Sequence, residues 1–227
     1  DLQWKELVRS MHKTGLNIIV IQETFRNQKY AGENEDSPAG YKGKAFYPSL
    51  LYKSRMPLKA SDPVEDILAE ADSLEMNVFL GVGMYAWFDF SRNSLEWHKK
   101  VAKELWNMYG HHRSFYGFYV SEESGGSLDN WEKDEQMRKK RQEEIVSFFS
   151  EFNAWCNSFA PSKPIMLATN SMGITSAKDI YPELLKNVDI LCPFGFSRMP
   201  PGDITGEQAA GMLQSFCDSA GAHLWLD

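Results

Sequence analysis

The sequence predicts an α/β fold, a (β/α)8 barrel of the TIM type, and three observations support this. Short apolar runs alternate along the chain with amphipathic stretches at helical spacing, which is the pattern of parallel βαβ units. The apolar runs lack polar alternation in their middle, as strands covered on both faces do. Neither a G-x-G-x-x-G fingerprint nor a P-loop follows any of them, which favours the barrel over a doubly wound sheet.

Six segments are predicted strands. They are residues 17–22, 77–83, 115–121, 164–170, 188–196 and 222–227. A closed barrel of this type needs eight strands, so two are missing from the count. We therefore expect either that the first and last strands lie outside this sequence or that the barrel is an open variant.

The segments between the strands carry signals for helix starts and ends. Asp62 stands three residues before Glu65, which predicts an N-cap and a capping box. Ser94 is predicted to open the next helix, and Gly110 to end it. An apolar stripe over residues 145–159 marks the longest helix.

Composition bounds the classes of function. The chain of 227 residues is 43% hydrophobic, which is enough to order one globular domain over residues 1–227. Its net charge of -7 disfavours nucleic-acid binding, which needs a concentrated basic face. The basic run at residues 137–142 lies beside acidic residues and is predicted to be a solvated helix face with internal ion pairs. No apolar run is long enough to span a membrane, and no signal peptide opens the chain.

Neither the cysteines nor the histidines have the spacing of a metal site. The three cysteines lie far apart, with no C-x-x-C pair, which argues against a zinc knuckle or a dense disulfide frame. Cys156 and Cys217 fall on apolar helix stripes and are predicted core residues. No two histidines have H-E-x-x-H or similar spacing, and His111 and His112 precede a strand, at the end of a barrel where residues usually serve stability. We expect no catalytic metal and no cofactor.

Polar, acidic and aromatic side chains gather near the ends of the predicted strands, where barrels of this type form their active face. Packing alone would not require so many of them at corresponding positions. The candidate catalytic residues are Glu123, Glu122 and Asp227, and the candidate substrate-binding residues are Gln22, Glu23, Tyr85, Trp87, Tyr119, Asn170, Phe194 and Arg198. The alternative for the aromatic residues is packing in the core or rim, and for Glu23 it is an ion pair.

Strand alternation distinguishes the two adjacent glutamates. Phe118 and Val120 occupy the alternate strand positions whose side chains face the surrounding helices. Tyr119 and Glu123 take the parity that faces the barrel axis, whereas Glu122 points away. Glu123 is therefore the stronger catalytic candidate.

Several segments resemble an uncharacterised bacterial family of glycosidase-like proteins. These segments are ADSLEMNVFLGVGMYAWFDF, HKKVAKELWNMYGHHRSFYGFYVSEE, KPIMLATNS and VDILCPFGF. Members of that family resemble the TIM-barrel retaining glycoside hydrolases, which place both catalytic carboxylates at strand ends. The likeness spans nearly the whole chain, from AFYPSLLY to AHLWLD.

The resemblance implies roles for individual residues. Glu123 matches the acid/base glutamate that ends the fourth strand of those enzymes. Asp227 is the only carboxylate at the end of the strand that matches their seventh, where the related pattern often has a glutamate one or two residues later. Glu122 stands where the retaining enzymes usually have asparagine, which is a departure from their pattern. The implied substrate is an oligo- or polysaccharide, with Gln22, Asn170 and Arg198 bonding hydroxyls or a uronic or sulfated group.

Two further expectations and two alternatives remain. By analogy with exported bacterial enzymes, the resemblance implies a periplasmic or secreted protein. Residues 25–61 exceed a normal βα connection, so we expect them to cover one side of the active face, with Lys44, Tyr47 and Tyr52 as candidate substrate contacts. One alternative is a non-catalytic carbohydrate-binding or interaction barrel. Another is aldol or lyase chemistry, but the strand ends lack the lysine of a Schiff base.

Overall fold

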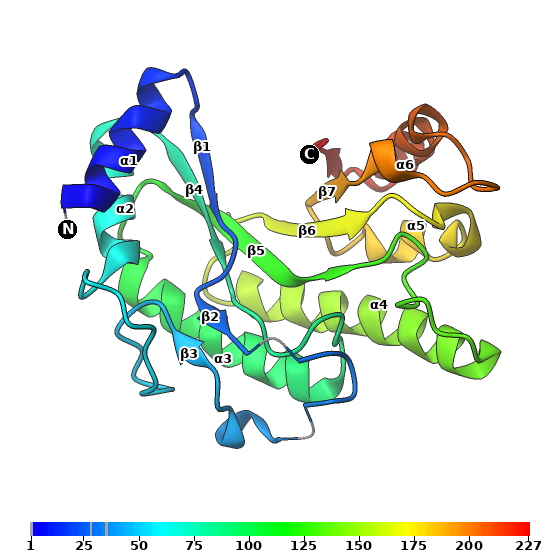
Figure 1. Cartoon of the computed structure of the whole chain (residues 1–227), viewed down its shortest axis with the longest axis horizontal. Coiled ribbons are helices and arrows are strands. Elements are labelled where there is room, and N and C mark those ends of the chain that lie inside the picture. The colour runs from blue at the N-terminus through cyan, green and yellow to red at the C-terminus, as the bar shows by residue number, and fades with distance from the viewer. Residues whose placement is uncertain (1, 28, 35) are drawn as a thin grey trace.

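The computed structural model describes residues 2–27, 29–34 and 36–227, and its central feature is a six-stranded parallel sheet curled into an open half-barrel (Figure 1). The strands lie side by side in chain order, which confirms all six predicted strands and the α/β barrel class. They are β1 (Ile18–Ile21), β4 (Asn77–Gly81), β5 (Phe115–Ser124), β6 (Ile165–Asn170), β7 (Ile190–Phe194) and β8 (His223–Leu224).

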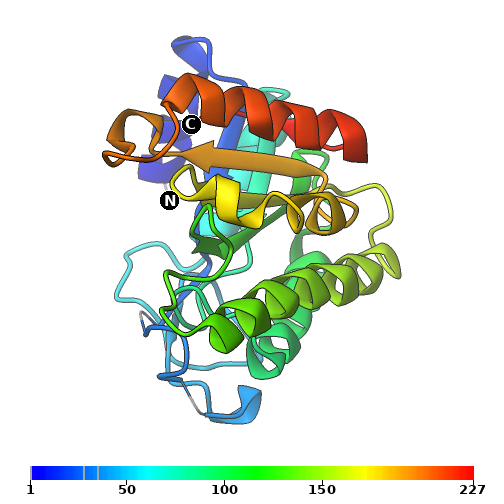
Figure 2. The same cartoon turned by 90° about the vertical axis from the view of Figure 1, so that its right-hand side faces the viewer.

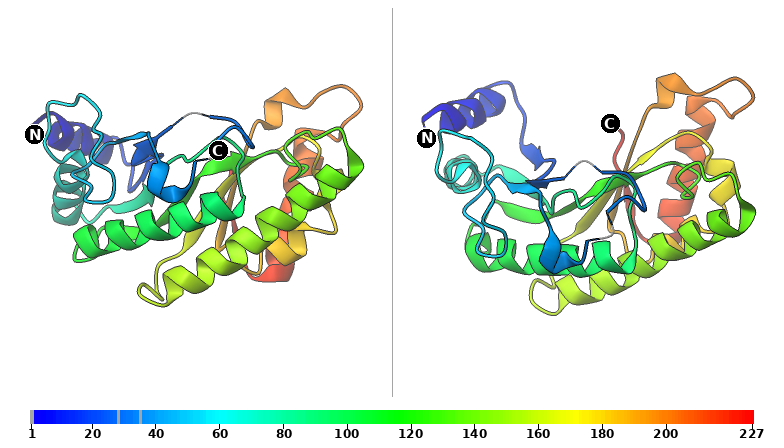
Figure 3. Two further views of the ribbon diagram at one scale, coloured as in Figure 1. Left: turned by 90° about the horizontal axis from the view of Figure 1, so that it is seen from below. Right: turned by 60° about the horizontal axis from the view of Figure 1, so that its bottom comes forward.

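The helices surround the convex side of this sheet. They are α1 (Leu2–Lys13), α2 (Pro63–Ser73), α3 (Arg92–Tyr109), α4 (Glu135–Asn157), α5 (Tyr181–Leu184) and α6 (Gly206–Ala220), with the short 3-10 turns η1 (Pro38–Gly40), η2 (Ile174–Ala177) and η3 (Phe196–Arg198). Helices α3 and α4 pack against each other beneath the central strands (Figure 3), and α6 lies beside β8 (Figure 2). Within the described residues, no helix is long and apolar enough to cross a membrane.

The sheet separates two apolar clusters. Phe118 and Val120 of β5 belong to the large cluster shared with the helices, whereas Tyr119 packs with Phe79 and Met166 on the concave face. This confirms the alternation predicted for β5. Because both faces are covered by apolar groups over the middle of the strands, polar side chains are left to the strand ends.

One predicted capping box and one predicted helix start need correction. Asp62 caps α2 as expected, accepting a hydrogen bond from the backbone N–H of Glu65 at 3.1 Å, but the predicted capping box is not formed because the Glu65 carboxylate pairs with a histidine instead. Helix α3 begins at Arg92, before the predicted Ser94, because Ser91 is the residue whose hydroxyl accepts from the Ser94 N–H.

Residues 25–61 contain a short antiparallel ribbon that sequence patterning did not predict, formed by β2 (Phe25–Arg26) and β3 (Lys44–Ala45). Glu104 of α3 anchors the segment. Its carboxylate accepts hydrogen bonds from the hydroxyls of Tyr47 and Ser49, each at 2.6 Å, and from the backbone N–H groups of Leu50 and Leu51. Tyr47 is buried, so its predicted role as a substrate contact is wrong.

The basic run on α4 forms the predicted ion pairs. Lys139 pairs with Glu135 at 3.1 Å, and Arg141 pairs with Glu144 at 3.0 Å. The predicted core positions of Cys156 and Cys217 are also confirmed, since both side chains are buried. These features stabilise the helical layer and take no part in the site described next.

Candidate active site

A cavity of about 630 Å³ opens on the concave face of the sheet, towards the carboxyl ends of the strands. Its walls are apolar along the strands and polar at the strand ends, which is the usual composition of a small-molecule site. The residues that line it are Val20, Gln22, Tyr119, Glu123, Met166, Ala168, Cys192, Phe194, Arg198, Trp225, Leu226 and Asp227.

A bulge near the end of β5 positions Glu123. Val120 pairs with Leu167 and Ser124 pairs with Thr169, so three residues of β5 stand opposite a single residue of β6. Glu123 has a φ of 54°, a left-handed conformation that costs a non-glycine residue about 1–2 kcal/mol. Bulges of this kind redirect side chains beside active sites. The direction of Glu123 therefore depends on the bulge as well as on alternation.

The surroundings of Glu123 favour its protonated form. Burial raises the pKa of Glu123, a hydrogen bond from Gln22 Nε2 to Glu123 Oε1 at 3.3 Å opposes the rise, and the negative charge of Asp227 adds to it. Asp227 is held at the same edge, because its backbone N–H donates to the carbonyl of Pro193 at 3.2 Å and continues the pairing with β7. Two carboxyl groups from strands distant in sequence thus face one cavity.

Glu122 lies on the opposite side of the sheet and does not line the cavity. Its side chain is fully buried, and Glu122 Oε1 accepts a hydrogen bond from the backbone N–H of Tyr85 at 2.6 Å. Burial raises the pKa of Glu122 well above that of an ordinary glutamate, and the Tyr85 N–H offsets part of the rise. The side chain ties the segment after β4 to the bulge that carries Glu123, and it has no path to a substrate in the cavity.

A buried histidine on α3 faces Glu122. His98 Nε2 lies 3.5 Å from Glu122 Oε1, and His98 Nδ1 lies 2.7 Å from the backbone carbonyl of Ser94. Because a carbonyl only accepts, Nδ1 carries the proton of a neutral ring and Nε2 is left as an acceptor. Burial lowers the pKa of His98 to about 4. A protonated Glu122 facing a neutral His98 leaves no uncompensated charge at this buried position.

Of the predicted substrate-binding residues, four line the cavity. Gln22 and Arg198 supply polar groups, and Tyr119 and Phe194 supply aromatic ones. The Arg198 guanidinium lies over the Phe194 ring, 5.8 Å from its centroid, which orients both side chains.

Glu23 and Tyr85 do not line the cavity. Glu23 forms an ion pair with Arg26, which is the alternative considered for it above. Tyr85 is buried in an aromatic cluster with Tyr41 and Trp97, and its hydroxyl donates to the backbone carbonyl of Asp36. Both side chains stabilise the segments that follow β1 and β4.

Asn170 and Trp87 also lie outside the cavity lining. Asn170 Oδ1 accepts from the backbone N–H of Met172 at 2.8 Å and so shapes the loop after β6. Trp87 packs beside Phe88, whose ring contacts the half-exposed Trp131 with 5.2 Å between centroids. This aromatic group lies in the loops that follow β4 and β5.

Sequence patterning missed Trp225 as a cavity residue. The signal was present, because Trp225 has the same strand parity as Asp227 and therefore faces the same side of the sheet. Trp225 also packs edge-on against Phe79, with ring centroids 5.8 Å apart. An indole at this position widens the apolar wall of the cavity.

The fold is shared with solved glycoside hydrolase structures. A protein assigned as an α-L-fucosidase from Bacteroides thetaiotaomicron is similar at 15% identity and a TM-score of 0.63, over 99% of this chain and 66% of that chain. β-Galactosidase from the psychrophilic Marinomonas ef1 is similar at 11% identity and a TM-score of 0.60, over 100% of this chain and 46% of that chain. Bacteroides uniformis β-glucuronidase 2 is similar at 11% identity and a TM-score of 0.54, over 97% of this chain and 22% of that chain.

At these low identities the TM-scores show a shared fold alone, and the chain spans less than two thirds of each of these proteins. No curated protein sequence matched the chain. A sequence family described as a domain of unknown function, DUF4434, matches residues 1–215. The chain therefore belongs to the DUF4434 family.

Proposed function

We propose that the protein is a glycoside hydrolase that cleaves an oligo- or polysaccharide at the concave face of the half-barrel. The observation that carries the proposal is the pair of carboxyl groups, Glu123 and Asp227, at the polar edge of one cavity with an apolar floor. The fold shared with glycoside hydrolases supports it. Glycosidic cleavage needs two such carboxyl groups on either side of the bond.

In this proposal Glu123 is the general acid. Its raised pKa keeps a proton available for the leaving oxygen, which is the property that environment confers on such acids in glycosidases. Asp227 is the second carboxylate, and either attacks the anomeric carbon or activates water. The separation between the two groups when substrate is bound decides between retention and inversion.

The remaining cavity residues bind the sugar. Tyr119 and Trp225 offer aromatic surfaces, which suit the apolar faces of sugar rings. Gln22 and Arg198 lie at the rim and donate hydrogen bonds to hydroxyl oxygens or to an acidic substituent. Gln22 also contacts Glu123, so its position couples sugar binding to the acid.

The test is a screen of the purified chain against aryl glycosides and polysaccharides, followed by substitution of Glu123. We expect Glu123→Gln to lower kcat by about 10²–10⁴-fold, the usual contribution of a general acid. Glu132→Gln is the matched control, because Glu132 lies on the loop after β5 and outside the candidate cavity. Activity that survives Glu123→Gln would remove the assignment of the acid.

A non-catalytic carbohydrate-binding barrel is the second candidate, and the aromatic group of Trp87, Phe88 and Trp131 favours it. These rings lie on loops at the carboxyl ends of β4 and β5, and Trp131 is half-exposed. Two results together would favour this candidate function. The unsubstituted protein would show no turnover, and Glu123→Gln would still bind saccharides. Binding that is lost in Trp131→Ala would place the sugar on these loops.

A further inference from the structure

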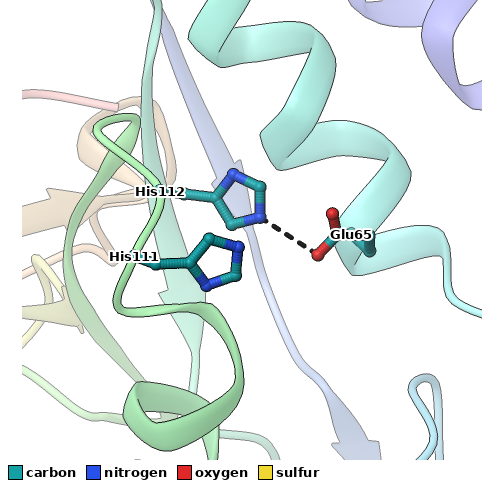
Figure 4. Close-up of side chains that lie close together, drawn as sticks. All are labelled: Glu65, His111 and His112. Atoms are coloured by element: carbon teal, nitrogen blue, oxygen red, sulfur yellow. Dashed lines mark hydrogen bonds and ion pairs between the residues drawn. The ribbon is translucent and has the colours of Figure 1, made fainter.

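At the opposite end of the barrel from the cavity, two histidines and a glutamate converge (Figure 4). His111 and His112 lie in the turn between α3 and β5, and Glu65 lies in the first turn of α2. One ligand atom from each of the three side chains lies within 4.8 Å of the others. Two imidazoles and a carboxylate are a donor set that suits zinc and similar divalent transition metals.

The distances are close to those of a coordination sphere. His112 Nε2 lies 3.0 Å from Glu65 Oε2. Two ligand atoms bound tetrahedrally to one zinc ion, with bonds of about 2.0–2.1 Å, lie about 3.3 Å apart. The two atoms therefore need to move apart only slightly to hold a metal ion between them. His111 stacks on His112 with 4.2 Å between ring centroids and is exposed, so it is able to rotate its ring towards the same point.

Asp72 holds His112 in the orientation that a metal ligand needs. Asp72 Oδ2 lies 2.7 Å from His112 Nδ1, and Asp72 Oδ1 accepts from the backbone N–H of Ser114 at 2.7 Å. A carboxylate on one imidazole nitrogen directs the other nitrogen to the metal, as in carboxylate–histidine–zinc arrangements. His112 is buried, so its ring is already held in place before any ion binds.

We propose that Glu65, His111 and His112 form a zinc-binding site that clips the start of α2 to the turn before β5. Three protein ligands are assigned, and water takes the fourth position. The site lies at the amino ends of the strands, away from Glu123, and so its role is to stabilise the fold. Glu65 lies 46 residues before His111 and 47 before His112, so no spacing motif could indicate the site.

The first test measures zinc binding directly. The purified chain, treated with a chelator and dialysed, is titrated with Zn²⁺ by calorimetry, and the melting temperature is measured with and without Zn²⁺. We expect one equivalent of zinc to bind and the melting temperature to rise with zinc concentration. No binding at 1 mM Zn²⁺ would show that the three groups form a hydrogen-bonded network only, and would overturn the proposal.

Substitutions then assign the ligands. His111→Ala removes an exposed side chain, so the protein should fold normally while zinc affinity falls by at least the roughly 10–100-fold that loss of an outer-shell partner costs. The matched control is His12→Ala, which removes an exposed histidine on α1 and should leave binding unchanged. Asp72→Asn should weaken binding about 10–100-fold while keeping one equivalent. Equal zinc affinity in His111→Ala and the unsubstituted protein would overturn the assignment.

Discussion

Replacing Glu122 with glutamine tests whether the buried pair of Glu122 and His98 is neutral. Glutamine has the shape of protonated glutamic acid and carries no ionisable proton, so its amide oxygen can keep the hydrogen bond from the Tyr85 N–H. In the unsubstituted protein Glu122 takes up a proton on folding at pH values between its unfolded-state and folded-state pKa, because burial raises the folded-state pKa. Glutamine removes this requirement.

The size and sign of the effect follow from proton linkage. A folded-state pKa above the unfolded value of 4.5 gives stability that is fully present below 4.5 and is lost as pH rises towards the folded-state pKa. The loss is about 1.4 kcal/mol per pH unit. Glu122→Gln should therefore gain stability relative to the unsubstituted protein by about 1.4 kcal/mol per unit above pH 4.5, until the folded-state pKa of Glu122 is reached.

His98 changes the free energy of unfolding with pH in the opposite direction. Its pKa is lowered from 6.5 to about 4, so its contribution to stability is present above pH 6.5 and is lost as pH falls towards 4. The two slopes oppose each other between pH 4.5 and 6.5 in the unsubstituted protein. Glu122→Gln keeps His98, so the difference between the two stability curves reports the slope of Glu122.

Urea denaturation at pH 5, 6, 7 and 8, followed by the fluorescence of the seven tryptophans, measures these free energies of unfolding. Glu122→Ala is the comparison, since it also lacks the carboxyl proton but leaves the Tyr85 N–H unpaired and opens a cavity; it should be about 3 kcal/mol less stable than Glu122→Gln at every pH. A buried ion pair instead of a neutral pair would make Glu122→Gln lose about 3–5 kcal/mol, and that result would refute the reasoning.

Three further substitutions test the site and its frame. Asp227→Asn should lower the pKa of Glu123, because it removes a negative charge that raises it; a carboxyl NMR titration of Glu123 that does not move would contradict this coupling. Glu104→Ala should cost about 3–5 kcal/mol in urea denaturation, because a buried anchor with four hydrogen-bond donors is lost; a loss below 1 kcal/mol would show that the anchor is dispensable. Gly81→Ala should cost about 3 kcal/mol in thermal or urea unfolding, because its Cβ would stand 2.1 Å from the backbone oxygen of Gln22, and an unchanged midpoint would argue against so close an approach of β1 and β4.

The sequence by itself determined the strands, their parity and the class of fold. All six strands could be predicted because a strand buried on both faces must be apolar along its middle, and an apolar run is visible in the local sequence. The same periodicity placed Tyr119 on the concave face and Phe118 on the helix side, as the two apolar clusters confirm. Trp225 follows the same rule, because it has the same strand parity as Asp227.

Only the tertiary structure decided which side chains meet. The bulge that carries Glu123 depends on how β5 pairs with β6, and Glu122 is buried because α3 brings His98 against it. The cluster of Glu65 and the two histidines likewise joins segments far apart in the chain. Periodicity records only which face of its own element a residue occupies, whereas these contacts depend on the distance between elements, and no local pattern encodes that distance.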